Sequence, residues 1–401
     1  MTGRPLHLAV VTSHPVQYYA PLFRELARRV DLTVFYGHRA TAEDQARAGF
    51  GVGFEWDVDL TTGFHSIFLD NRARHPGLAR FSGIDTPQIG QRLSEGRFDA
   101  VLLIGWHKKF LVQALVAARR LGIPALMRGD SQLGTARSLL VRLAKELVYP
   151  LFLRQYAGAL AVGARNRSYW RHYHYPAARI FASPHCIDAA WFAERGTVAA
   201  GTALRRRLGI AADAPLVLFA GKLIAFKRPL EVVEAAARLR AAGTPVQILV
   251  AGDGPLRAAM AARAGNLAVP LHLLGFCNQS EMPAAYAAAD VLALPSSRSE
   301  TWGLVVNEAL ACGTPAVVSD AVGCAPDLVR LLGNRSCFPF GDVERLAARL
   351  GETLDSPPST AAMAAANQAL SLSAAADGVI AAMRTVVREK PLVDVTGAIP
   401  S

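Results

Sequence analysis

The residues best suited to chemistry lie in the segment Pro295–Pro315, which reads PSSRSETWGLVVNEALACGTP. Glu300 and Glu308 flank a glycine, Gly303, that we expect to open an apolar helix. Backbone N–H groups at the start of a helix bind phosphate, and a glycine there lets a ligand approach the main chain. Glu308 would accept hydrogen bonds from a ribose diol, and Glu300 from a sugar hydroxyl. The pattern predicts a phosphate and sugar site; an ordinary helix with an acidic first turn is the alternative.

Two lysines stand in another loop, Gly221–Arg228, which reads GKLIAFKR and follows an apolar run. Only six of the 43 basic residues of the chain are lysines, so the pair Lys222 and Lys227 is unusual for this composition. Compact ammonium groups are suited to holding a diphosphate. A solvated surface loop is the alternative interpretation.

A glycine-rich turn, Ala251–Pro255 (AGDGP), follows the next apolar run. Gly252 and Gly254 suit a tight turn beneath a nucleotide, although such a turn alone is a weak signal. All three loops follow expected strands of the same half of the chain, and ligands of open α/β sheets bind outside the carboxyl ends of the strands. Their coincidence predicts a site for a nucleotide diphosphate.

The elements that position these loops alternate between short apolar strands and amphipathic helices in both halves of the chain. This alternation predicts an α/β protein with two doubly wound, parallel-sheet domains. We place the boundary near 192–203, which gives an N-terminal domain over 1–192 and a second domain over 193–375. A C-terminal helix and tail, 376–401, are expected to pack back on the first domain. Strands are predicted at 6–11, 32–36, 101–104, 124–127, 160–162, 180–182, 216–219, 246–250, 271–274, 291–294 and 316–318.

Composition excludes several classes of protein. The chain has 401 residues, of which 52% are hydrophobic, so it can bury sizeable cores and is not disordered. Its five cysteines form no C-x-x-C pair, which indicates reduced thiols rather than a disulfide scaffold or a zinc site. We expect no signal peptide and no strongly apolar, uncharged window of about 18 residues. A cytoplasmic protein is predicted, either soluble or peripheral at the inner face of the membrane.

Positive charge is concentrated in the first half. Residues 71–190 contain 18 Lys and Arg residues against 6 Asp and Glu, a net charge of +12 within a total of +11. No basic and aromatic motif of a nucleic-acid module accompanies it, so an anionic acceptor or an anionic membrane surface is the expected partner. Arg137–Arg154 (RSLLVRLAKELVYPLFLR) is either a membrane-surface helix beside a lipid-linked acceptor or a core helix with snorkelling arginines. We favour the core helix.

Four segments together resemble the retaining nucleotide-sugar glycosyltransferases of family four, glycosyltransferase group 1. They are GKL with its second lysine, AGDGP, the pair Leu274–Gly275 and PSSRSETWGLVVNEALACGTPAV. The resemblance is strong over 214–330 and holds for the first half only in outline, with the segment Phe181–Asp188. It implies the GT-B fold, in which two Rossmann-like domains face each other across a cleft.

The resemblance also implies an activity. This is the transfer of a hexose-type sugar, with retention of configuration, from a UDP or GDP sugar to a hydroxyl acceptor in bacterial glycan or natural-product biosynthesis. The acceptor would be anionic or lipid-linked. No metal and no other cofactor is implied, and Asp57-Val-Asp59, which has the spelling of an Asp-x-Asp metal motif, is expected away from the nucleotide loops. A GT-B epimerase or hydrolase and a non-catalytic nucleotide-sugar-binding scaffold are the alternatives.

Residue by residue, the resemblance assigns the diphosphate to Lys222 and Lys227, the ribose to Glu308 and the donor sugar to Glu300. Lys222 stands where the family usually has arginine, which changes the geometry but keeps the charge. The resemblance assigns the remaining contacts to phosphate, sugar and base, and the turns beneath them, to Gly221, Gly252, Gly254, Phe276, Gly303, Leu304 and Val305.

The first half supplies fewer candidates. Gln17 lies in the loop after the first strand, where the family contacts acceptor and donor phosphate. Arg128 and Asp130, in the segment Met127–Ser131 (MRGDS), occupy the place of a functional histidine of the family; a salt-bridged loop is the alternative. His107, in GWHKKF, follows another strand, and an exposed loop histidine is its alternative.

Overall fold

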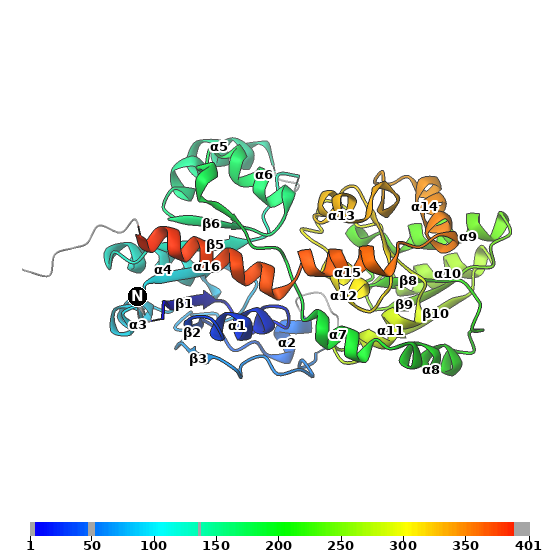
Figure 1. The fold of residues 1–401 in the computed structure, drawn as a ribbon, viewed down its shortest axis with the longest axis horizontal. Helices are drawn as coiled ribbons and strands as arrows, with labels where there is room; N and C mark the ends of the chain where they lie inside the picture. The colour runs from blue at the N-terminus through cyan, green and yellow to red at the C-terminus, as the bar shows by residue number, and fades with distance from the viewer. Residues whose placement is uncertain (1–4, 47–52, 135–137, 389–401) are drawn as a thin grey trace, which may run out of the picture.

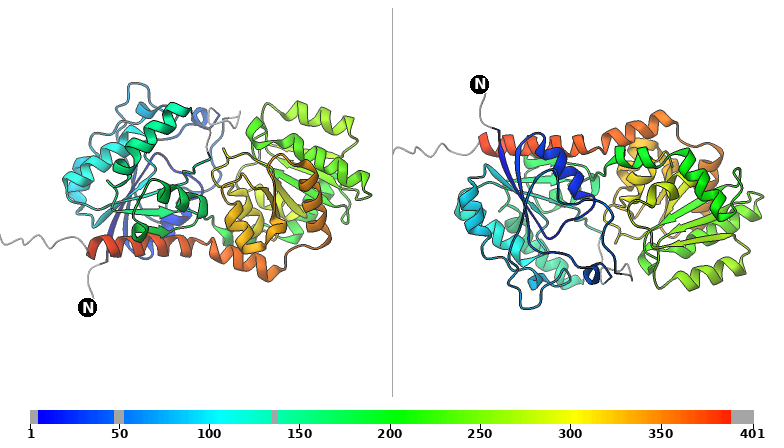
Figure 2. Two further views of the ribbon diagram at one scale, coloured as in Figure 1. Left: turned by 90° about the horizontal axis from the view of Figure 1, so that it is seen from above. Right: turned by 90° about the horizontal axis from the view of Figure 1, so that it is seen from below.

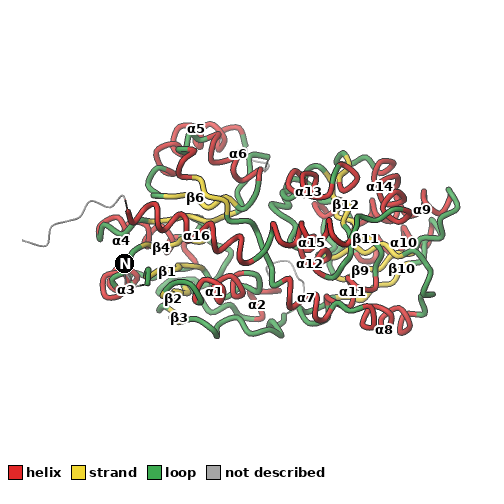
Figure 3. The backbone as a smooth tube through the Cα atoms, in the orientation of Figure 1, coloured by secondary structure: helices red, strands yellow, loops and turns green. Residues whose placement is uncertain are grey.

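The computed structural model describes residues 5–46, 53–134 and 138–388, which form two α/β domains side by side (Figure 1). Each domain is built on one sheet, and every neighbouring pair of strands within the two sheets is parallel. The strands lie at the centre of each domain with helices around them (Figure 3). The predicted fold class, two Rossmann-like domains with parallel sheets, is confirmed.

The first sheet has the strand order β3-β2-β1-β4-β5-β6-β7. Its order reverses between β1 and β4, so the loops after these two strands flank its switch point, where open sheets bind ligands. β3 is a short strand that the sequence pattern did not predict. The strands are β1 His7–Thr12, β2 Asp31–Tyr36, β3 His65–Phe68, β4 Ala100–Ile104, β5 Ala125–Gly129, β6 Gly158–Ala161 and β7 Ile180–Ala182.

Helices cover both faces of this sheet and bury the apolar side chains of its strands. α4, for example, packs Phe110, Leu111 and Leu115 into the core on one face of the sheet. The helices of this domain are α1 Tyr19–Ala27, α2 Ala42–Gln45, α3 Ile89–Gly96, α4 Lys109–Arg120, α5 Leu139–Leu153 and α6 Ala164–His172.

The second sheet has the order β10-β9-β8-β11-β12-β13, with its switch point between β8 and β11. The loops that carry the lysine pair and Glu300 follow these two strands, which places them at the switch point. The strands are β8 Leu216–Ala220, β9 Gln247–Ala251, β10 Leu271–Gly275, β11 Val291–Leu294, β12 Ala316–Ser319 and β13 Cys337–Phe338. The helices are α7 Ala189–Arg195, α8 Val198–Leu208, α9 Pro229–Ala241, α10 Arg257–Asn266, α11 Met282–Ala288, α12 Val305–Ala311, α13 Ala325–Leu332 and α14 Val343–Asp355.

The last two helices, α15 Thr360–Ala369 and α16 Leu372–Arg388, connect the second domain back to the first. α15 contacts α12 and α13, whereas α16 contacts α1, β6 and β7. Both views of Figure 2 show this helical pair running along one side of the two domains. Ser183, beyond β7, donates a hydrogen bond from its hydroxyl to the carbonyl of Ala375 (2.9 Å), which fixes α16 to the first domain.

The same helical stretch corrects one expectation. Thr360–Arg388 is long and apolar enough to cross a membrane by length and composition, although no such window was predicted. Its apolar residues pack in a protein core here. Val379, Ala382, Met383 and Val386 are buried against the first domain. A helix that contributes to a domain core passes the same composition test.

Candidate functional site

Three loops of the second domain meet at the carboxyl ends of β8, β9 and β11. The N–H of Gly221 donates to the carbonyl of Ala251 (2.9 Å), and the N–H of Ser297 donates to the carbonyl of Phe226 (2.8 Å). Gly252 has φ +149°, and a Cβ there would lie 1.9 Å from the carbonyl oxygen of Gly221, so only glycine permits this approach. Gly254 belongs to the same turn. The structure therefore brings together the loops in which the donor residues were predicted.

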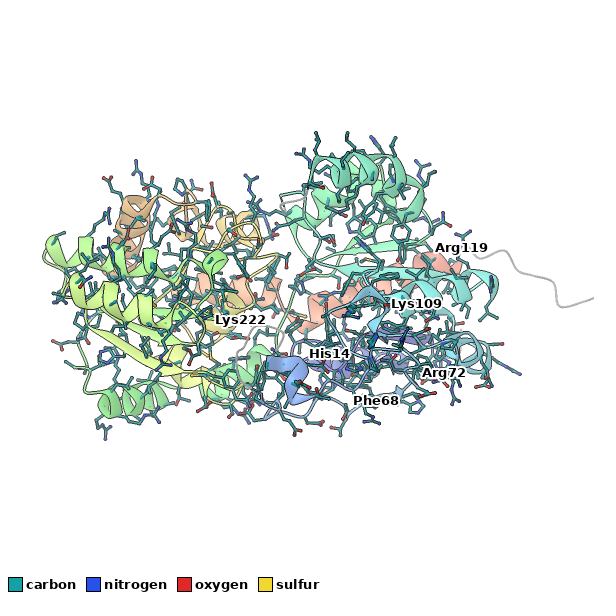
Figure 4. All side chains as sticks on the ribbon, turned by 180° about the vertical axis from the view of Figure 1, so that it is seen from behind. His14, Phe68, Arg72, Lys109, Arg119 and Lys222 are labelled. Carbon is teal, nitrogen blue, oxygen red and sulfur yellow. The ribbon has the colours of Figure 1, made fainter. Side chains whose placement is uncertain are left out.

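Lys227 and Glu300 form an ion pair across two of these loops, with side chains 12% and 14% exposed. Lys222 is half-buried beside them, and its pKa is lowered, first by burial and then by the charge of Lys227. Figure 4 shows Lys222 on the side of the second domain that faces the first. Lys222 thus adds a partly desolvated positive charge beside the Lys227–Glu300 ion pair, an arrangement that an anionic ligand would stabilise.

Glu308 lies on α12, one turn beyond the glycine turn. The hydroxyl of Tyr286, on α11, donates to Glu308 Oε2 at 2.5 Å. Burial raises the pKa of Glu308 to about 7, and the Tyr286 hydrogen bond opposes that rise without cancelling it. The carboxyl is thus held in one orientation and is close to its titration point near neutral pH.

The turn before α12 has the geometry predicted from the sequence. Gly303 has φ +97°, and a Cβ there would lie 2.8 Å from Leu294 Cδ2, so a side chain has no room. Leu304 is the N-cap residue and Val305 begins the helix. Asn307, on this helix, accepts a hydrogen bond from the Trp302 indole (2.9 Å) and donates to the carbonyl of His185 (3.1 Å). Trp302 and Asn307 lie within the segment singled out from the sequence, but these two positioning contacts were missed, because the motif does not show which groups the side chains pair with.

A cavity of 570 Å³ lies between the domains, and Glu308 lines it from the second domain. Gln17 lines it from the loop after β1, and it is thus the first-domain candidate that faces the predicted ribose contact. Asp57, Val58 and Asp59 line the same cavity, so this triplet shares the cleft with Glu308, although no residue of the three nucleotide loops lines that cavity. The hydroxyl and N–H of Ser280, just after β10, donate hydrogen bonds to the Asp57 carboxylate.

This link is possible because the segment that carries Asp57 crosses to the second domain. Phe54 packs its ring 4.4 Å from that of Phe276, where the base was expected. Asn278 donates a side-chain hydrogen bond to the carbonyl of Glu55 (2.8 Å). Among the described residues, no three His, Cys, Asp or Glu side chains gather as a metal site. Independence from metal stays a prediction.

Arg128 and Asp130 make contacts in different parts of the molecule. The Arg128 guanidinium is buried and donates to the Ser183 hydroxyl (3.2 Å) and to the carbonyl of Pro184 (2.8 Å). It therefore fixes the segment that leads out of β7. Asp130 accepts a hydrogen bond from the hydroxyl of Thr301 (2.5 Å), next to Glu300 in the second domain. In place of the salt-bridged loop that was the alternative for this segment, the structure has contacts of Arg128 within the first domain and a contact of Asp130 between the domains.

A second, wider cavity of 970 Å³ lies on the first-domain side of this contact. His107, Arg128 and Asp130 line it, together with Arg298 and Thr301 from the second domain. His107 is exposed, as its alternative interpretation expected, and partial desolvation, followed by the charge of Lys108, lowers the pKa of its imidazole.

Two further histidines were not predicted as site residues. Burial lowers the pKa of His185 to about 3, and its ring centroid lies 5.5 Å from that of Trp302. Burial lowers the pKa of His14, after β1, to about 4, and the charge of His38 adds to the effect. Both imidazoles are neutral at physiological pH. They were missed because their partners lie far away in the sequence.

Comparison with known proteins follows the division into domains. Residues 202–369 match the family described as glycosyl transferases group 1. Over 213 residues the chain is 34% identical to the D-inositol 3-phosphate glycosyltransferase of Mycolicibacterium vanbaalenii, covering 49% of this chain and 45% of that protein. Over 104 residues it is 38% identical to the GDP-mannose-dependent alpha-(1-6)-phosphatidylinositol dimannoside mannosyltransferase of Mycobacterium tuberculosis, covering 26% and 27%. The chain thus spans less than half the length of these relatives.

Solved structures resemble nearly the whole chain. Anabaena HepE in complex with UDP and glucose has a TM-score of 0.69 at 15% identity, covering 95% of this chain and 100% of that one. The alpha,alpha-trehalose 6-phosphate synthase of Burkholderia multivorans has a TM-score of 0.69 at 15% identity, covering 99% and 100%. At this identity the likeness establishes the fold. Residues 202–369 therefore belong to the glycosyl transferases group 1 family, within a chain that as a whole has the GT-B fold.

Proposed function

We propose that this protein is a glycosyltransferase that moves a hexose-type sugar from a nucleotide diphosphate sugar to a hydroxyl acceptor in the cleft between its domains. One observation carries the proposal. Lys222 and Lys227, from the loop after β8, meet Glu300, from the loop after β11, at the switch point of the second sheet, and Glu308 on the helix that follows lines the cavity between the domains. The family match of the same domain supports it.

The reaction proceeds with retention of configuration by attack on the face that the leaving group departs from. A bond forms between the acceptor oxygen and the anomeric carbon, and the bond from that carbon to the diphosphate oxygen breaks. The departing diphosphate takes the acceptor proton, so no carboxylate of the protein serves as base. Lys222 and Lys227 stabilise the negative charge that develops on the diphosphate. Chelation of divalent metals is expected to leave the activity unchanged.

The donor is a UDP or GDP sugar. HepE binds UDP and glucose in its solved structure, and the M. tuberculosis relative is GDP-mannose-dependent. Glu308 accepts the ribose hydroxyls in either case, because ribose is common to both nucleotides. Gln17 approaches the donor from the first domain.

The acceptor is anionic or lipid-linked and belongs to bacterial glycan or natural-product biosynthesis. The net charge of +12 over residues 71–190 supports an anionic partner. The M. tuberculosis relative acts on a phosphatidylinositol dimannoside, and a relative from Streptomyces kanamyceticus is a 2-deoxystreptamine glucosyltransferase. A cytoplasmic location, with contact at the inner face of the membrane, fits such substrates.

The test is a donor screen by thermal shift, followed by mass spectrometry with pooled acceptors. We expect one nucleotide-sugar class to raise the melting temperature and a product heavier than an acceptor by one hexose-type residue. Products formed from the donor alone, identified by NMR, would instead show an epimerase or hydrolase. Donor binding without turnover of any acceptor would indicate a scaffold, and absence of donor binding would overturn the proposal.

A further inference from the structure

The helix α5 exposes aliphatic side chains where a surface helix ordinarily exposes polar ones. Leu140, Leu143, Leu147 and Leu151 recur every three or four residues and so share one side of the helix. Their exposed fractions are 79%, 54%, 79% and 68%. The favoured expectation of a core helix with snorkelling arginines is therefore wrong for the described part of Arg137–Arg154, which excludes Arg137.

The opposite side of α5 is anchored, so this exposure is a fixed property of the fold. Leu153 is buried, and Phe152 and Tyr149 pack into an aromatic cluster with Trp106 of the first domain, at ring-centroid distances of 6.2 Å. Lys145 also points inward, with its ammonium group 4.5 Å from the ring centroid of Tyr149. The helix is thus held by its aromatic side, and it lies at the outer edge of the domain (Figure 1).

The wide cavity opens beside this helix. Val141 of α5, Leu133 and Phe81 are exposed apolar residues that line it. The rest of its lining is polar and mostly basic, with Arg142, Lys145, His107, Arg128 and Arg298 among the lining residues, opposed by Asp130 and Glu146. Exposed apolar residues beside basic ones fit a molecule with an anionic head and an apolar tail.

We propose that the exposed side of α5 docks on an anionic phospholipid surface and that the wide cavity takes the head group of an amphiphilic, anionic acceptor from it. The second part rests on the proposed function; the first does not. Two observations favour lipid over a protein partner. The stripe is aliphatic, with its aromatic residues turned inward, and the surrounding region 71–190 carries the surplus positive charge that an anionic surface attracts.

Co-sedimentation of the full chain with vesicles tests the docking. Vesicles of phosphatidylcholine mixed with phosphatidylglycerol should bind the protein, vesicles of phosphatidylcholine alone should bind it weakly, and added salt should reduce binding. The triple variant L140S/L147S/L151S should lose about tenfold or more of its vesicle affinity. The controls are Val198→Ser on α8 and Leu121→Ser after α4, which remove exposed apolar side chains elsewhere and should bind as the wild type does.

Several outcomes would overturn the proposal. These are absence of vesicle binding by the wild type, equal binding by the triple variant, or an α5-dependent dimer in light scattering that vesicles do not dissociate. Circular dichroism and the melting temperature confirm that the triple variant is folded, as expected for changes at exposed positions. Calorimetric titration with UDP and GDP separates the two proposals. A wild-type chain that binds a nucleotide but no vesicles contradicts the docking alone, and a wild-type chain that binds vesicles but neither nucleotide contradicts the proposed function.

Discussion

The donor side and the acceptor side of the cleft are built in different ways. On the donor side, short loops at one switch point are tied together by backbone hydrogen bonds, and each contributes its charged residues within a few positions of a strand end. On the acceptor side, residues from many elements line the wide cavity. Its most buried cation, Arg128, donates hydrogen bonds to the Ser183 hydroxyl and the Pro184 carbonyl. The charged residues of the donor-side loops are proposed to bind ligand, whereas Arg128 on the acceptor side fixes the fold.

The largest expected effect tests the donor side of this comparison. Lys227→Ala removes an ammonium group that stabilises the leaving diphosphate, so kcat should fall by about 10²–10³. Steady-state turnover of the donor identified in the screen measures it. Lys109→Ala, which removes a lysine paired with Asp85 in the first domain, is the control and should retain wild-type turnover. Near-normal turnover and donor affinity in Lys227→Ala would refute the assignment.

The next effect tests the acceptor side. Arg128→Met leaves the carbonyls of Ser183 and Pro184 without their buried donor, so the free energy of unfolding should fall by about 2–4 kcal/mol. Urea denaturation measures it. Arg119→Met, on the outer end of α4 (Figure 4), should change that free energy by no more than about 0.5 kcal/mol. If Arg128→Met unfolds like the wild type but loses turnover, Arg128 acts on substrate and the contrast between the two sides fails.

Glu308→Gln should reveal a balance between stability and binding. Burial raises the pKa of Glu308 from 4.5 to about 7, so the native state keeps a proton that the unfolded chain loses between these values. Stability from this group is full below pH 4.5 and declines as pH rises toward 7. The variant should therefore gain about 1–3 kcal/mol over the wild type between pH 5 and pH 8, while binding nucleotide more weakly. Denaturation at both pH values, with calorimetry, measures it; a stability difference independent of pH would contradict it.

The smallest effect concerns the segment that crosses from the first domain. Asp57→Ala removes exposed hydrogen bonds to Ser280, which should raise the donor KM by about fivefold or less and leave kcat unchanged. Ser280→Ala should act in the same way, and the double variant should add little to either single change. A fall in kcat would show that Asp57 acts in the reaction itself.

Donor-side residues could be predicted from the sequence because each loop carries its signal locally, as in GKLIAFKR or the glycine turn before α12. Contacts on the acceptor side could not, because their partners are remote: Arg128 and Ser183 are 55 positions apart, and Asp57 and Ser280 are 223 apart. No spacing rule connects such pairs.

The fold shows the same limit. Long apolar runs such as β1 and β8 were predictable, but the strands HSIF and Cys337–Phe338 are too short or too polar to stand out. The sequence of Arg137–Arg154 indicated a helix with one apolar side. It did not show whether protein covers that side, since a core helix and a membrane-surface helix have the same repeat.

Calorimetric titration of the wild-type chain with UDP and GDP, repeated on the double variant K222A/K227A, tests the central claim most directly. The account predicts that one of the two nucleotides binds at one site per chain and that the double variant binds it about 100-fold or more weakly. Binding of neither nucleotide, or equal binding by the wild type and the double variant, would contradict the claim that the loops at the switch point of the second sheet hold the donor diphosphate.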